Sequence, residues 1–366
     1  MRWPRSCVAK RNAASGRSAP KKGSRAAGKP ARGKPAAPPR RRGRVVAVML
    51  SLLAVLLLVL GLIWAFAPRE NGSFDPPPVA DLPENLDSWL YAEESGIRPD
   101  VARRIVWGGR PGVKTPIALI YLHGFSATSQ ELRPVPDLIA AWRGANLYFA
   151  RLTGHGMDGG SLDNARVDDW ARDVAEAIAI GQRLGEKVVV IGTSTGGTLA
   201  ALAARDPELG PAIDAVVLVS PNFAMQARGL FLLRQPLARH WLPLIAGRER
   251  CFEPRNDAHR DYWTSCYPPT AALSMAAMVA EARRADYSTA TQPLLALFSD
   301  ADRIVDPKAT EAVLQGWGGQ VTRVSVTLGP GDDPDSHVIA GDILSPGQTA
   351  PLATRINGWI TQIFGE

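Results

Sequence analysis

The chain has 366 residues, of which 46% are hydrophobic, and its 42 basic and 35 acidic residues give a net charge of +7. This length and apolar content can fill one large core domain with accessory segments. A uniformly basic protein is excluded, because 15 of the basic residues and none of the acidic ones lie in residues 1–44, which leaves 27 basic against 35 acidic residues. A basic tail therefore precedes a mildly acidic body.

Residues 1–44 form this basic tail. They are rich in Pro, Gly, Ala and Ser and have no hydrophobic periodicity, which predicts disorder. A tail of this composition can bind nucleic acid. We do not expect a nucleic-acid partner here, because the tail runs directly into an apolar segment.

Residues 45–67 contain no charged side chain over 23 positions. As a helix they would extend about 35 Å, enough to cross a hydrocarbon core of about 30 Å. Arginines crowd the N-terminal end of the run and Trp64 lies near the other. By the positive-inside rule, this pattern predicts a single transmembrane signal-anchor helix with a cytoplasmic N-terminus and an exported catalytic domain, periplasmic or extracellular. A cleaved signal peptide is the alternative, since residues 65–67 read Ala-Phe-Ala, but Pro68 would hinder cleavage and the run is long.

The three cysteines fit this topology. Cys7 would remain in the reducing cytoplasm, whereas Cys251 and Cys266 would lie outside, where disulfides persist. We therefore predict a Cys251–Cys266 disulfide. The alternative is a pair of unpaired buried thiols.

Beyond the apolar run, residues 68–99 are polar and proline-rich and are interpreted as a linker and lead-in. Strand-like and helix-like segments then alternate over residues 100–366, which predicts an α/β domain with a doubly wound, mainly parallel sheet. This alternation of strand-like and helix-like segments is interrupted at about residues 221–288. These residues include aromatics, prolines and both cysteines expected to be exported, but no comparable strand pattern. We interpret this segment as a lid inserted between two strands.

The segment from Val188 to Thr198 contains the pattern Gly-x-Ser-x-Gly, centred on Ser194, between an apolar strand and a helix of small residues. This is the sequence context of a nucleophile elbow, in which the serine stands on a sharp strand-to-helix turn. Residues two positions away must be nearly free of side chains for the turn to close. Ser194 is thus the candidate nucleophile.

A serine hydroxyl needs a base, and the chain has five histidines. Triads on doubly wound sheets run in the order serine, acid, histidine, which removes His123 and His155. His240 and His259 lie in the expected lid. His337 follows the last expected strand, where catalytic loops gather, and is the candidate base.

The acid is expected after the first strand beyond the lid, and its task is to orient the imidazole. We expect this acid to be Asp302, with Asp300 as the alternative in the same loop. Asp306 precedes a proline and is expected to cap the next helix. Another alternative is the acidic cluster beside His337, which comprises Asp332, Asp333 and Asp335.

An oxyanion hole needs two backbone N–H groups. One is expected from Thr195, the residue after the nucleophile, and the other from Phe125, in the loop that follows the apolar strand ending at Leu122. His123 is expected to brace that loop.

Together, the segments His123-Gly124-Phe125, Gly154-His155-Gly156 and Gly192 to Gly196, the Asp302 loop and His337 resemble the α/β-hydrolase fold from about residue 100 to the C-terminus. Within it they are similar to the serine carboxylesterase and monoacylglycerol-lipase-like group. The resemblance implies a Ser194–His337–Asp302 triad, an oxyanion hole from Phe125 and Thr195, and a lid that shapes an acyl pocket. Haloalkane dehalogenases and epoxide hydrolases of this fold carry aspartate at the elbow. Because this chain has Ser194 there, we do not expect either of these two activities.

We therefore expect a membrane-anchored serine hydrolase that cleaves small-molecule or lipid esters through an acyl-enzyme, with no metal and no organic cofactor. The same triad can serve an amidase, a thioesterase or an acyltransferase. The alternative of another class is a catalytically inactive, membrane-tethered binding module. The sequence does not indicate an oligomeric state.

Overall fold

The computed structural model describes residues 33, 40–227 and 229–365, and it divides the chain into two compact units, Met1–Leu58 and Val59–Glu366. Cys7 and most of the expected disordered tail lie outside the described residues. Helix α1 (Arg40–Phe66) contains a 24-residue stretch, Gly43–Phe66, that is apolar apart from Arg44 near its start and has a mean hydropathy of 3.1. It is the one helix of the described part that is long and apolar enough to cross a membrane. The helix begins at Arg40, inside the expected tail, because arginine is a good helix former.

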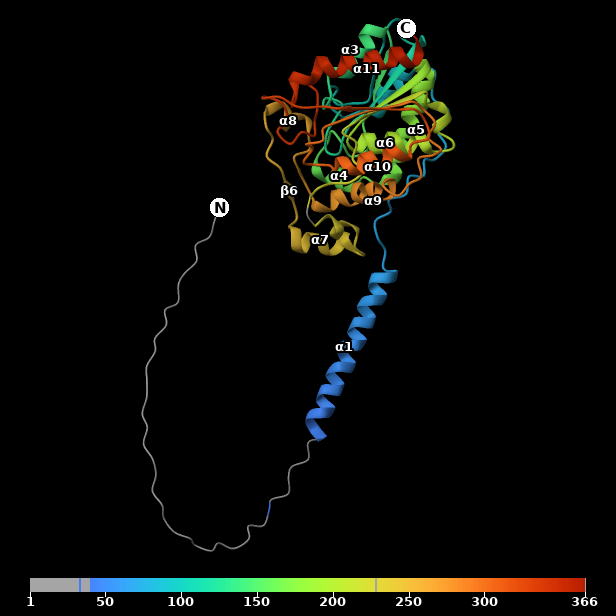
Figure 1. Cartoon of the computed structure of the whole chain (residues 1–366). Helices are drawn as coiled ribbons and strands as arrows, with labels where there is room; N and C mark the ends of the chain where they lie inside the picture. Colours follow the sequence, from blue (N-terminus) through green and yellow to red (C-terminus); the bar gives the residue numbers. More distant parts are fainter. Residues whose placement is uncertain (1–32, 34–39, 228, 366) are drawn as a thin grey trace, which may run out of the picture. The chain divides into compact units, whose positions relative to one another are not determined.

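A seven-stranded sheet forms the centre of the second unit, in the order β1-β3-β2-β4-β5-β8-β9 (Figure 1). Only β1 is antiparallel to its neighbour. The strands are β1 (Arg104–Val106), β2 (Thr115–Leu122), β3 (Asn146–Phe149), β4 (Gly185–Thr193), β5 (Ala215–Val219), β8 (Leu294–Phe298) and β9 (Val321–Ser325). The predicted mainly parallel sheet is confirmed.

Helices cover both faces of this sheet. One face packs against α3 (Val135–Arg143) and α11 (Thr349–Phe364). The other packs against α5 (Val167–Leu184), α6 (Thr195–Arg205), α9 (Ala272–Ala282) and α10 (Pro307–Gly316). Smaller helices are α2 (Leu86–Glu93), α4 (Gly159–Asn164), η1 (Gly210–Ala212) and η4 (Pro346–Gln348). Buried strands with nearly unbroken apolar runs are what coverage on both faces requires.

The segment between β5 and β8, called the insert below, contains no strand of the main sheet, although β5 and β8 pair directly. It runs from residue 220 to residue 293 and thus contains the predicted lid segment. Its elements are η2 (Leu230–Arg234), α7 (Ala238–Ala246), β6 (Arg250–Cys251), α8 (Asp257–Tyr262), β7 (Cys266–Tyr267), η3 (Pro269–Ala271) and α9. The pair β6–β7 is a short antiparallel ladder that the sequence pattern did not reveal.

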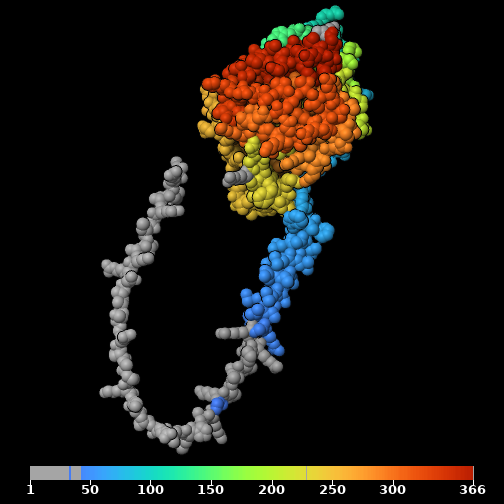
Figure 2. All heavy atoms as spheres, in the orientation of Figure 1, coloured from blue at the N-terminus to red at the C-terminus, as the bar shows by residue number. Residues whose placement is uncertain are grey.

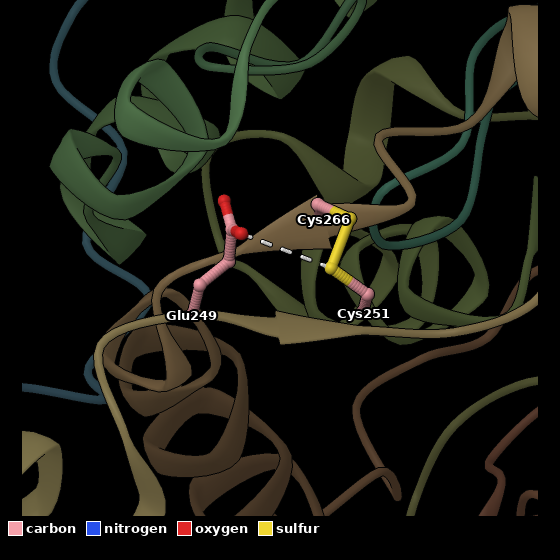
Figure 3. Close-up of side chains that lie close together, drawn as sticks. All are labelled: Glu249, Cys251 and Cys266. Atoms are coloured by element: carbon pink, nitrogen blue, oxygen red, sulfur yellow. Dashed lines mark hydrogen bonds between the residues drawn. A yellow bond between two sulfur atoms is a disulfide. The ribbon is translucent and has the colours of Figure 1, made fainter.

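Cys251 and Cys266 form a disulfide across this ladder, as predicted (Figure 3). The loop it closes contacts two other parts of the domain. The Thr264 N–H donates to the Ser126 carbonyl at 2.7 Å, and Asn256 Nδ2 donates to the Ile343 carbonyl at 2.7 Å. The disulfide loop (residues 251–266) therefore braces segments that flank the insert on both sides in the sequence.

Replacing both cysteines by serine is expected to destabilise the disulfide loop. Closing a loop of 15 residues contributes about 3 kcal/mol through the restricted unfolded chain. Hydrogen–deuterium exchange should show faster exchange in residues 251–266 of the variant than in the wild type. Equal protection of the loop in wild type and variant would contradict the prediction.

Candidate active site

Ser194 occupies the sharp turn between β4 and α6, with φ 50° and ψ −114°. This backbone conformation is strained for a residue with a side chain and persists only where its surroundings hold it. Here the Ser194 N–H donates to the Val219 carbonyl at 2.9 Å, and the Ser194 carbonyl accepts from the Asn222 N–H at 3.0 Å. A Cβ on Gly196 would lie 2.2 Å from the Leu122 carbonyl oxygen, so the turn closes only with glycine there.

The structure brings together Ser194, His337 and Asp302, which the sequence places far apart. Ser194 Oγ lies 3.0 Å from His337 Nε2, and His337 Nδ1 lies 2.8 Å from Asp302 Oδ2. The Asp302 side chain is 1% exposed and that of His337 12%. A hydroxyl, an imidazole and a carboxylate in this order can pass the hydroxyl proton to the imidazole and stabilise the resulting cation.

Asp302 is fixed in this position by its own backbone surroundings. Its Oδ1 accepts hydrogen bonds from the N–H groups of Ile304 at 2.8 Å and Val305 at 2.9 Å. Because that oxygen is occupied, Oδ2 is the one turned toward His337. The backbone of these two apolar residues thus anchors the Asp302 side chain.

The alternative carboxylates lie elsewhere. Asp300 bonds the side chains of Arg323 and Ser325. Asp306 caps α10 by accepting from the Lys308 N–H, as expected. Asp333 accepts from the backbone N–H groups of His337 and Val338, both at 3.0 Å, so it supports the histidine loop without touching the imidazole. Among the carboxylates that the structure describes, only Asp302 is hydrogen-bonded to the His337 ring.

Opposing effects act on His337. Its burial lowers the pKa, but the hydrogen bond and negative charge of Asp302 outweigh this, with further contributions from Glu131 and Asp333. The pKa of His337 is therefore raised above its ordinary value of 6.5.

The loop after β2 contains Phe125, the residue expected to supply an oxyanion donor. The N–H of Phe125 donates to no acceptor among the described residues, and Thr195 lies in the first turn of α6, where N–H groups lack intrahelical partners. His123 braces the loop as expected, because its Nδ1 lies 2.9 Å from the Gly124 carbonyl and its Nε2 accepts from the Leu152 N–H at 3.1 Å. Burial lowers the pKa of His123 to about 4, which keeps the ring neutral.

Glu131 is a buried residue that the sequence analysis missed. Its Oε2 accepts from the Gly124 N–H at 2.7 Å and lies 3.3 Å from the Tyr121 hydroxyl. That hydroxyl is also 3.1 Å from Thr193 Oγ1. The chain Gly124–Glu131–Tyr121–Thr193 therefore links the residue before Phe125 to the residue before Ser194. No motif marks Glu131, because its partners are set by the folded core.

The structure also places the remaining histidines and one group of possible metal ligands. His240 and His259 lie in the insert, and His259 Nδ1 accepts from the Arg255 N–H. His155 packs edge-on against Phe125. Within the described part, the side chains close enough to share a metal are Glu249, Cys251 and Cys266. Both sulfurs of that group are joined in the disulfide (Figure 3).

The fold and these motifs define an α/β hydrolase of the lipase and esterase type. Residues 114–329 match the family described as Serine aminopeptidase, S33, and the chain belongs to this family. It is 24% identical over 201 residues to a thermostable monoacylglycerol lipase from Bacillus sp. (strain H-257), an alignment that covers 55% of this chain and 76% of the relative.

Solved structures share the fold. A metagenome-derived lipolytic enzyme from the study of LipS and LipT superposes with a TM-score of 0.59 at 18% identity, covering 73% of this chain and 99% of that one. The monoacylglycerol lipase of Paleococcus ferrophilus superposes with a TM-score of 0.53 at 16% identity, covering 71% and 98%.

Proposed function

We propose that this protein is a membrane-anchored serine hydrolase that cleaves carboxylic esters through an acyl-enzyme on Ser194. The observation that carries the proposal is the continuous arrangement of Ser194 Oγ, His337 and Asp302 at 3.0 and 2.8 Å. Ser194 is the nucleophile, His337 the base and Asp302 the residue that orients the base. The insert serves as the lid over this site.

In the first half of the reaction, Ser194 Oγ attacks the ester carbonyl carbon while its proton moves to His337 Nε2. The N–H groups of Phe125 and Thr195 stabilise the oxyanion, each by about 3 kcal/mol. Collapse of the tetrahedral intermediate breaks the carbon–oxygen bond, and Nε2 gives its proton to the leaving alcohol. In the second half, water attacks the acyl-enzyme with the same base, and the acid leaves as Ser194 regains its proton.

The substrate class is proposed from the relatives and from an apolar hollow in the insert. The names of two relatives describe monoacylglycerol lipases. A hollow of about 210 Å³ is lined mainly by apolar side chains, among them Phe223, Met225 and Leu230. Phe223 follows Asn222, whose N–H bonds the Ser194 carbonyl. We therefore propose an ester with an aliphatic acyl chain as the substrate.

Location outside the cytoplasm is proposed from two features. Arginines precede the apolar stretch of α1, so the positive-inside rule keeps the N-terminus in the cytoplasm. The disulfide between Cys251 and Cys266 is of the kind that persists in oxidising compartments. A reporter fused after residue 67 that is active only in the cytoplasm would contradict this topology.

A set of p-nitrophenyl esters of graded chain length, combined with a fluorophosphonate probe, tests the proposed reaction. The folded wild-type protein should react with the probe and hydrolyse the esters, with a preference for longer acyl chains. A folded protein that neither reacts nor hydrolyses would instead be the inactive binding module.

Amide hydrolysis is the second candidate, because the matching family is described by the name of a serine aminopeptidase. Amino-acid p-nitroanilides provide the comparison. Higher kcat/KM on these amides than on the esters would replace esterase by peptidase as the proposed activity.

The pH dependence of the activity follows from the raised pKa of His337. Only the neutral imidazole can accept the Ser194 proton, so kcat/KM for a soluble ester should rise with pH through a midpoint above 6.5. A pH–rate profile between pH 5 and 9 measures the midpoint. A profile that is flat, or that falls over this range, would contradict the role of His337.

Two substitutions of Glu131 should separate its hydrogen bond to the Gly124 N–H from the effect of its charge on the pKa of His337. Glu131→Met removes the acceptor of the buried Gly124 N–H, which costs about 1–3 kcal/mol of folding stability. If the adjacent Phe125 N–H moves as a result, kcat should fall about tenfold for each 1.4 kcal/mol of lost transition-state stabilisation. Burial raises the pKa of Glu131 to about 7, and its ionised carboxylate raises the pKa of His337. Glu131→Gln keeps an acceptor but can never carry this charge, so the acid limb should move to lower pH. Equal kcat and equal pH profiles in all three proteins would show that Glu131 does not position the loop.

A further inference from the structure

The linker after α1 is bound to the insert over its first residues. The Leu237 N–H donates to the Pro68 carbonyl at 2.9 Å, just before α7 begins. Glu70 Oε1 lies 2.8 Å from Arg239 Nη2 and accepts from Ser274 Oγ at 3.0 Å. The Glu70 side chain is only 13% exposed, so these are partly buried contacts rather than loose surface pairs.

The backbone of the linker also lies tightly against α9. A Cβ on Gly72 would be 2.3 Å from the Ala277 carbonyl oxygen. Residues 68–72 are thus held against α7 and α9. Phe66, the last residue of α1, comes two positions before Pro68, and two residues span at most about 7 Å. Phe66 is therefore separated by only a short length of chain from Pro68, whose carbonyl accepts from the Leu237 N–H.

The same part of the insert exposes large apolar side chains. Phe231 is 66% exposed, Leu244 83% and Ile245 65%; we call these three residues the docking patch. The patch belongs to η2 and α7, whose inner sides pack together around Leu242. In Figure 2 these gold-coloured elements stand out from the domain surface. Exposed apolar groups clustered on one protruding element are typical of an interaction site.

The charge around the docking patch indicates the kind of partner. Arg234, Arg248 and Arg250 are exposed next to it in the sequence, and Glu249 is the one acidic residue among positions 229–250. Arginines beside apolar side chains suit a bilayer, where the headgroups carry negative charge and the acyl region lies just below.

We propose that the docking patch inserts into the bilayer that α1 enters, so that the insert takes a lipid ester directly from that bilayer. This inference rests on the proposed membrane anchor and deepens the proposed esterase function. The apolar hollow of the insert supports it, because Phe231 and Arg234 line the hollow together with Phe223. An acyl chain that enters beside Phe231 would reach Phe223, which follows Asn222, and the Asn222 N–H donates to the backbone carbonyl of Ser194.

A fluorescent probe on the patch tests the inference without using activity. Full-length Ser194→Ala protein that also carries Cys7→Ser and Ile245→Cys, labelled with an environment-sensitive dye, is reconstituted into vesicles with and without anionic lipid. The emission should shift to shorter wavelength and be quenched by spin-labelled lipids. The matched control is the dye at Val113, which is 46% exposed in the loop between β1 and β2 and should show neither change.

Ester hydrolysis in vesicles provides a second test of the proposed insertion. Leu244→Asp/Ile245→Asp should lower hydrolysis of a long-chain ester in vesicles about tenfold or more, since one buried aliphatic side chain is already worth about that factor. In the same variant, hydrolysis of a soluble short-chain ester should stay unchanged. The control variant Val113→Asp should hydrolyse both the vesicle ester and the soluble ester at the wild-type rate. A dye at Ile245 that remains in water would overturn the docking, and so would protein that does not float with the vesicles. If the wild-type protein does not hydrolyse the soluble ester at all, the proposed esterase function itself is refuted.

Discussion

Replacing Ser194 by alanine is expected to lower kcat for a soluble p-nitrophenyl ester by about 10⁶-fold, the size of effect seen when the nucleophile of a serine triad is removed. The methyl group cannot form the acyl-enzyme, and His337 then has no proton to accept. The oxyanion donors Phe125 and Thr195 remain, so a small residual rate over water should persist.

Ser220 supplies a matched control for this substitution. It is another buried serine with positive φ, 45° compared with 50° at Ser194. Alanine at position 220 should leave kcat within about twofold, because its hydroxyl has no hydrogen-bond partner in the described structure. Fluorophosphonate labelling should disappear in Ser194→Ala and persist in Ser220→Ala. Undiminished turnover in Ser194→Ala would refute the acyl-enzyme mechanism.

Asp302→Asn should lower kcat by about 10⁴-fold while leaving the loop folded. The N–H groups of Ile304 and Val305 require an acceptor, so the amide oxygen will face them and the NH₂ group will face His337. Nδ1 must then accept a hydrogen bond, which places the ring proton on Nε2. In that tautomer His337 cannot take the proton of Ser194.

The control for this substitution is Asp300→Asn in the same loop. Asp300 bonds Arg323 and Ser325 at the surface, and loss of an exposed pair of this kind has little effect, so kcat should stay within about twofold. The acid limb of the pH–rate profile should move to lower pH only in Asp302→Asn, because Asp302 raises the pKa of His337. Comparable losses in both variants would mean that the site depends on the total charge of the loop.

The order of segments along the chain was sufficient to predict much of this arrangement. Apolar runs and glycines identified the strands and the turn at Ser194, because those features are local. The contact of His337 with Ser194 spans 143 positions and could be predicted only through the known order of triad residues. The place of Asp302 before the apolar residues Ile304 and Val305 favoured it over Asp300 without excluding Asp300. The backbone N–H groups that hold its carboxylate are visible only in the structure.

Other features have no local pattern. Glu131 binds Gly124 and Tyr121 through side-chain burial, and nothing in the spacing of these residues indicates a network. The hydrogen bond from the Leu237 N–H to the Pro68 carbonyl joins a proline-rich segment to the start of a helix far along the chain. Composition alone describes that segment only as a linker. The start of α1 at Arg40 likewise depends on helix propensity continuing past the apolar run.

The disulfide loop has a consequence for attempts to redesign the enzyme. Through Thr264 it holds the carbonyl of Ser126, next to Phe125, and through Asn256 it holds Ile343, beyond His337. A chimera that exchanges the whole insert for that of a relative would therefore disturb the geometry of the reacting groups as well as the choice of substrate. Exchanges confined to η2 and α7 leave residues 251–266 in place and are the more conservative route to altered chain-length preference.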